Sequence, residues 1–295
     1  MAEAPIFAEL AHRDKVIGIL HDVLARHGMQ VDLNRMDIHL SDKVIIESFA
    51  KGAYLSEAVL NYMFPHEPAP CTLYHYTSLE GIEGIVQSGE LRLYPVRKRL
   101  GQGGELDAFA KAHGLLGYLN VSEDEAFYKT LSDDLFYISM TRVPPKDPYL
   151  MWGAFAKGTG VRLEFQVQPK VAELRPIRYE QDNSTTLLTE INQALEYAGE
   201  PPFNPWTISK IGAFYLDSTV KSEDEVRLLL KRHVGGIDMT RSDDSSRYWP
   251  IPIGEENEFC QVELTGVHIA PSGDRSAIET ILRRTRFSTV PITEP

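Results

Sequence analysis

The sequence has only two cysteines, Cys71 and Cys260, among its 295 residues. A secreted protein held together by disulfides would carry more, so this shortage favours a reducing compartment. No apolar run approaches the roughly 20 residues that a helix needs to cross a bilayer. The first residues lack the basic stretch followed by an apolar run that marks a secretory signal. These absences predict a cytoplasmic protein that does not enter a membrane.

The signatures of several common enzyme classes are missing as well. There is no phosphate-binding loop, no glycine-rich dinucleotide fingerprint after a strand, and no GxSxG nucleophile motif. The cysteines and histidines show no metal-ligand spacing, so we expect no metal site. A net charge of -12 disfavours broad attachment to phosphate backbones or anionic lipid. Two short basic clusters, at 97–99 and 283–286, are better explained as solvated surface than as a basic cleft.

What the chain does contain is the composition of an ordinary globular protein, 43% hydrophobic and 24% charged. Residues 1–64 predict an N-terminal helical cap, with helices over 7–28, over 41–49 and over 56–64. The prolines of PHEPAP make residues 65–70 a linker. Residues 71–295 then form the main domain. A cap packed on that domain is the simpler interpretation of the N-terminal part, and a partner-binding or dimerising arm is the alternative.

The main domain opens with a strand, a helix and a second strand. CTLYHY is rich in β-forming residues, and the apolar residues of 79–88 recur on one helical face. Thr77 and Glu80 have the spacing of a capping box, and Gly89 suits the left-handed end of a helix. Later strands are predicted at 135–140, 161–167, 226–234, 259–264 and 267–270, with helices at 185–198, 206–216 and, capped by Ser276, near the end. Strands and helices do not alternate strictly, which favours an α+β fold.

The first of three candidate segments is Tyr74-His75-Tyr76-Thr77, at the end of the opening strand. A histidine can hydrogen-bond a sugar hydroxyl while a neighbouring aromatic ring forms a stacking wall. A histidine bonded to neighbouring backbone inside a sheet is the commoner arrangement. Spacing alone therefore favours a structural His75.

The other two segments lie on later strands. Ser139 and Thr141 alternate onto one face of their strand. Glu223 and Glu225 would share a face if that segment is extended, with Arg227 following on the same side. Two carboxylates this close repel each other unless a cation or hydroxyl compensates. Each segment alone is also compatible with ordinary β-surface or an acidic loop.

Taken together, residues 71–285 resemble the bacterial family known as domain of unknown function 2971. The likeness rests on LYHYTSLEGIEGIVQSGELRL, FYISMTR, LMWGAFAKGTGVRLEF, EDEVRLLL and VHIAPSGDRSAIETIL. GQGGELDAF departs from the NDPxE-like stretch that the family often carries after the first unit. At greater distance the order of parts is similar to the ADP-ribosyltransferase superfamily, with a histidine on a first strand, hydroxyls on a middle strand and a glutamate on a later one. This resemblance implies a split β-sheet core with flanking helices.

The resemblance also implies site roles. Catalysis would fall to Glu225, Glu223 and His75, and NAD, as co-substrate, would be bound by His75, Tyr76, Thr77, Ser139, Thr141, Trp152 and Arg227. ADP-ribose would pass to a protein or nucleic-acid acceptor. The implied setting is a toxin or anti-phage effector, a class that is often held by an inhibitory partner protein.

Two other functions stay open at this point. The acidic residues with Asp243 and Asp244 could form a metal-dependent nuclease or phosphoesterase site, although no histidine is near them. The domain could also be a non-catalytic module that binds a nucleotide or a partner, because fold likeness alone does not give function.

Overall fold

A computed structural model describes residues 4–48, 54–96, 109, 112–113, 134–142, 147–179, 185–232, 238–243 and 246–294. Its helical elements are α1 (Ala4–Arg26), η1 (Leu33–Arg35), α2 (Tyr54–Met63), α3 (Leu79–Ser88), α6 (Pro148–Leu150), the π-helical turn η5 (Met151–Phe155), α7 (Leu187–Tyr197), α8 (Ile208–Ala213), η6 (Ser218–Glu223) and α9 (Arg275–Arg283). None of the described helices has the length and apolar character needed to span a membrane.

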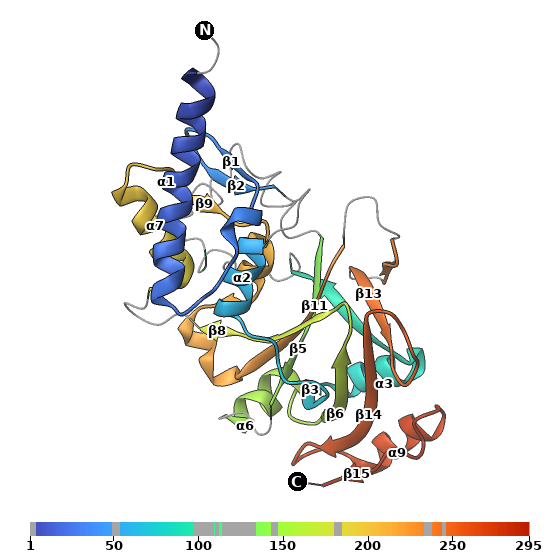
Figure 1. The fold of residues 1–295 in the computed structure, drawn as a ribbon. Coiled ribbons are helices and arrows are strands. Elements are labelled where there is room, and N and C mark those ends of the chain that lie inside the picture. Colours follow the sequence, from blue (N-terminus) through green and yellow to red (C-terminus); the bar gives the residue numbers. More distant parts are fainter. Residues whose placement is uncertain are drawn as a thin grey trace.

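The strands confirm the α+β prediction and form one large mixed sheet with two small ones (Figure 1). They are β1 (Ile38–Leu40), β2 (Ile45–Glu47), β3 (Cys71–Thr77), β4 (Glu90–Pro95), β5 (Leu135–Thr141), β6 (Val161–Pro169), β7 (Glu173–Pro176), β8 (Arg178–Tyr179), β9 (Phe203–Asn204), β10 (Tyr215–Leu216), β11 (Glu225–Lys231), β12 (Arg241–Ser242), β13 (Arg247–Pro252), β14 (Cys260–Ile269) and β15 (Ile292–Thr293). In the large sheet the order is β12-β13-β4-β5-β3-β6-β14-β15, and β11 pairs with β5 and β7.

The N-terminal part is only partly helical. Gly28 lies in the left-handed region just beyond α1, as predicted. The expected helix over 41–49 is wrong, because β1 and β2 pair there as an antiparallel hairpin around Ser41. Short apolar runs do not distinguish strand from helix by period alone. Buried Glu47 at the end of β2 accepts hydrogen bonds from the backbone N–H groups of Leu55 and Ser56, both at 2.9 Å, and so caps the start of α2.

The strand–helix–strand unit is confirmed, with its cap displaced by one residue. Ser78, not Thr77, is the N-cap of α3 and accepts from the backbone N–H of Gly81. Gly89 closes the helix at φ 68°, a conformation that favours glycine. In the same way Asp274, not Ser276, caps α9.

Two apolar cores lie on opposite faces of β5 and β11. The side chains of Tyr137 and Leu229 belong to one core, and those of Ile138 and Leu228 to the other. The first core combines buried residues of α1 and α2 with those of α7 and α8, so the expected N-terminal cap shares its interior with residues 187–213. Figure 1 shows α1 and α7 side by side, apart from α3 and α9. The second core is covered by α3 and α9.

Strand β5 is the point where the large sheet divides. Along one edge it pairs with β11 over its whole length. On the other edge, Phe136 and Tyr137 pair with β4, whereas Thr141 pairs with β3. Strands β3 and β4 therefore part from each other along β5, and α3 joins them.

Candidate functional site

The acidic segment does not run as one strand. Glu223 ends the 3-10 helix η6, and Asp224 follows in the left-handed region at φ 46°. Strand alternation therefore applies only from Glu225 onward, and the expectation that Glu223 and Glu225 share a strand face is wrong. The turn at Asp224 sets Glu225 at the first position of β11, opposite Thr141.

Glu225 is held by a set of polar contacts. Its side chain is buried, with the residue only 2% exposed, and its carboxylate accepts a hydrogen bond from the Ser139 hydroxyl. Arg227 donates to both carboxylate oxygens, at 2.8 and 3.2 Å. The Glu225 backbone N–H donates to the hydroxyl of Tyr179 at 2.8 Å. The carboxylate is therefore fixed by neighbours on its own strand and on β5.

Arg227 lies in the interior and has no exposed surface. Its guanidinium donates to the carbonyl of Ala213 as well as to Glu225, and it stacks 4.3 Å from the ring centroid of Tyr137. The predicted alignment of Glu225 and Arg227 on one face is confirmed. These contacts suit an arginine that orients the carboxylate, so the structure gives the NAD-contact role expected for Arg227 no support.

No pattern in the sequence predicts a role for Tyr179. Burial raises the pKa of its hydroxyl, so this group stays protonated. Tyr179 belongs to β8, which is too short to show a period. It lies next to Glu225 because β7 pairs with β11 and the backbone N–H of Ile177 donates to the carbonyl of Glu225 at 2.9 Å. A two-residue strand could not have been found by pattern.

His75 lies on β3, where alternation puts its side chain on the opposite face from Tyr74 and Tyr76. Its Nδ1 donates to the carbonyl of Ser139 at 2.9 Å. This carbonyl belongs to the stretch of β5 between its pairings with β4 and β3. His75 thus contacts the candidate site through the main chain of Ser139, the backbone contact that spacing alone favoured.

The aromatic residues expected to stack on a ligand do meet. Tyr76, 5% exposed, and half-buried Trp152 lie edge to face with their ring centroids 4.9 Å apart. Trp152 belongs to η5, and π-helical turns are frequent at functional sites. Thr77, the last residue of β3, lies on the same strand face as His75.

A row of directly paired residues crosses the sheet at this level. Glu225 pairs with Thr141, Thr141 with Tyr74, and Tyr74 with Glu164. Directly paired residues share a face, and a spacing of about 4.8 Å per strand separates the two glutamates by about 14 Å at Cα. The row defines one face of the sheet, here called the Glu225 face, which also carries Ser139 and Tyr76.

Glu164 is a second polar centre on the Glu225 face and was not predicted. Its carboxylate accepts from Tyr74 at 3.3 Å, from Thr265 at 2.9 Å and from His268 at 3.1 Å. Burial raises the pKa of Glu164, but these hydrogen bonds outweigh it and hold the pKa below its usual value. The alternation of VRLEFQV puts Glu164 on the polar face of its strand, a signal that could have found it.

Asp243, one of the acidic residues of the nuclease alternative, contacts residues of β4. Asp243 accepts from Arg92 at 3.1 Å and from Tyr94 at 2.9 Å, next to β4. Among the residues that the structure describes, no group of three or more His, Cys, Asp or Glu side chains could hold a metal ion. Asp244, the basic residues 97–99 and residues 101–108 of GQGGELDAF lie outside the described part of the chain.

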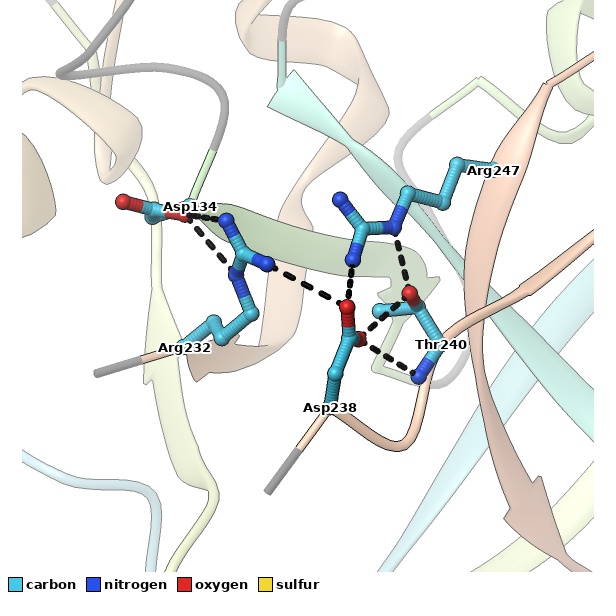
Figure 2. Close-up of polar contacts among 5 residues, drawn as sticks. All are labelled: Asp134, Arg232, Asp238, Thr240 and Arg247. Atoms are coloured by element: carbon cyan, nitrogen blue, oxygen red, sulfur yellow. Dashed lines mark hydrogen bonds and ion pairs between the residues drawn. The ribbon is translucent and has the colours of Figure 1, made fainter. Parts of the chain in front are cut away.

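The end of β5 and β11 remote from Glu225 carries a different polar cluster (Figure 2). Arg232 donates to Asp134 at 2.7 and 3.0 Å and to Asp238 at 3.3 Å. Arg247 pairs with Asp238 and Thr240. Each arginine here has an acidic partner, so the cluster is best described as surface ion pairs that join the ends of neighbouring strands.

No protein-family model, curated protein or solved structure matches this chain. The resemblance to domain of unknown function 2971 and to ADP-ribosyltransferases therefore stays a prediction.

Proposed function

We propose that this protein is an NAD-dependent ADP-ribosyltransferase that transfers ADP-ribose to a protein or nucleic-acid acceptor. The observation that carries the proposal is the hydrogen bond from Ser139 to the buried carboxylate of Glu225. It joins a hydroxyl on a middle strand to a glutamate on a later strand, the pair that this chemistry uses. The parting of β3 and β4 along β5 supports the split-sheet core of that superfamily as part of the proposal.

The reaction requires a fixed negative charge. Breaking the bond between nicotinamide and C1′ of the ribose sends the electron pair to the nicotinamide nitrogen and leaves positive charge on the sugar. A carboxylate held in place by fixed hydrogen bonds stabilises that charge electrostatically. Glu225 would take this role and accept from the ribose 2′-hydroxyl, while Ser139 and Arg227 keep it in place.

The other residues take supporting roles in the proposal. Glu223, one turn residue away from Glu225, would orient the acceptor and accept its proton as the new bond to C1′ forms. Trp152 would stack on the nicotinamide, with Tyr76 behind it. The ribose-binding role that the resemblance implies for His75 is not part of the proposal, because its side chain lies on the opposite strand face from Tyr76 and bonds the carbonyl of Ser139. We also assign the protein to the cytoplasm, since both of its cysteines are free thiols.

A second candidate is a nucleotide-binding module without turnover. Glu225 is 2% exposed and is paired with Arg227 through both carboxylate oxygens, so the carboxylate must be uncovered before it can approach a sugar. A domain that only binds a nucleotide needs no such step. NAD would then raise the melting temperature while no nicotinamide is released.

Labelled NAD, incubated with the protein and separately with protein extract, DNA or RNA, tests the proposal. We expect label transfer to one acceptor class, reduced about 100-fold or more in Glu225→Gln. Glu196→Gln changes an exposed glutamate on α7 and is the matched control. If the wild-type protein shows no label transfer and no nicotinamide release, the proposed enzyme activity is rejected.

A further inference from the structure

Three buried polar atoms without a hydrogen-bond partner lie on the Glu225 face. They are Thr141 Oγ1, Tyr76 Oη and Arg162 Nε, from the neighbouring strands β5, β3 and β6. Tyr76 pairs directly with Arg162, and Tyr74 pairs directly with Thr141. Buried polar groups are almost always satisfied in folded proteins, and each exception calls for an explanation such as a water or a ligand. Three exceptions on adjacent strands of one face indicate a site that is completed from outside.

Arg162 is the charged member of this group. Its guanidinium lies 4.7 Å from the ring centroid of Tyr74. Within the described part of the chain, no residue forms an ion pair with it or accepts a hydrogen bond from its buried Nε. The acid next to it on the same face, Glu164, already accepts from Tyr74, Thr265 and His268.

Other arginines of this sheet show what is missing at Arg162. Arg92 stacks on Tyr248 at the same 4.7 Å, but it also donates to Asp243 at 3.1 Å. The two arginines of Figure 2, Arg232 and Arg247, both contact Asp238. Burying a cation without an anion is unfavourable, so a half-buried arginine that has no acid is suited to an anionic ligand.

We propose that Arg162, Tyr76 and Thr141 form a binding site for a phosphoryl group. The planar guanidinium fork matches phosphoryl oxygens, and the two hydroxyls can each donate a further hydrogen bond. The site lies between Trp152, which touches Tyr76, and Glu225, which pairs with Thr141. Resting on the proposed function, the phosphoryl group is one half of the NAD diphosphate, held while the nicotinamide end reaches Trp152 and Glu225.

Calorimetric titration of inorganic pyrophosphate and of ADP-ribose into the full chain tests the site. In Arg162→Gln the Kd for both ligands should rise about 10-fold or more, the size of one charge-assisted contact. Arg92→Gln is the matched control, since it removes a stacked arginine of the same sheet and should leave both Kd values unchanged. Equal affinities in wild type and Arg162→Gln would overturn the proposal, and so would the absence of binding of either ligand to the wild-type protein at millimolar concentration.

The melting temperature without ligand separates binding from structure. Arg162→Gln removes an unpaired charge, so the melting temperature should stay the same or rise. Arg92→Gln removes the ion pair between Arg92 and Asp243 and should lower the melting temperature. A lowered melting temperature in Arg162→Gln together with unchanged pyrophosphate affinity would make Arg162 a structural residue.

The same variants distinguish this inference from the proposed function. Pyrophosphate binding that depends on Arg162, in a protein that releases no nicotinamide, would keep the phosphoryl site and reject its assignment to NAD. If nicotinamide is released with the same KM for NAD in wild type and Arg162→Gln, the proposed enzyme activity is retained and the phosphoryl site at Arg162 is rejected.

Discussion

The buried pair of Glu225 and Arg227 makes a strong prediction about stability. Arg227→Met removes two hydrogen bonds to the carboxylate and one to the carbonyl of Ala213, and it leaves Glu225 charged in the interior. Breaking one side of a buried pair costs about 3–5 kcal/mol of unfolding free energy. Hydrogen bonds to charged groups, at about 1.5–3 kcal/mol each, give a loss of the same order. Urea unfolding followed by circular dichroism measures it.

The double variant Glu225→Gln/Arg227→Met decides whether the two residues act as a unit. Once the carboxylate is replaced by a neutral amide, removing the arginine no longer strands a charge. The double variant should therefore lose about 1–3 kcal/mol less than the sum of the single variants. Additivity within about 0.5 kcal/mol would refute the claim that Arg227 serves to hold Glu225.

Three further predictions concern other parts of the described structure. Burial lowers the pKa of His113 to about 4, so between about pH 6.5 and pH 4 only the unfolded chain takes up this proton. The free energy of unfolding should therefore fall by about 3 kcal/mol as the pH drops through that window. In His113→Gln, urea unfolding should show a flatter dependence on pH over the same window. A Cβ on Gly160 would meet the carbonyl oxygen of Thr77 at 2.2 Å, so Gly160→Ala should lower the melting temperature and shift the fluorescence of Trp152, whereas Gly153→Ala, with open space around it, should do neither. Asp238→Asn weakens an exposed cluster, so it should change the melting temperature little, and that change should shrink in high salt.

Local pattern predicted the elements that carry the candidate site. The strand at 71–76, the helix to Gly89 and the strands at 135–140 and 161–167 all follow from β-forming residues, apolar periodicity and a glycine stop. Alternation predicted that Ser139 and Thr141 share a face of one strand and that Glu225 and Arg227 share a face of another. Their meeting depended on the pairing of β5 with β11, which links residues more than 80 positions apart.

Other features were set by contacts that local pattern does not contain. The hairpin of β1 and β2 depends on pairing with β9, far along the chain. Strand β13 was missed because it carries Pro250 and Pro252, which local propensity places outside strands. The predicted strands at 259–264 and 267–270 are one strand, β14, with an irregularity between Leu264 and Gly266. Arg162 lies on a strand that the sequence predicted, but its lack of an acidic partner depends on tertiary contacts that the sequence pattern does not contain.

Nicotinamide release from NAD, followed by chromatography, tests the central claim most directly. Wild type, Glu225→Gln and the exposed-site control Glu196→Gln are compared after each has been shown to be folded by its melting transition. The account predicts release by the wild type and the control, and a loss of about 100-fold or more in Glu225→Gln. Equal release by all three proteins, or none by the wild type, would contradict it.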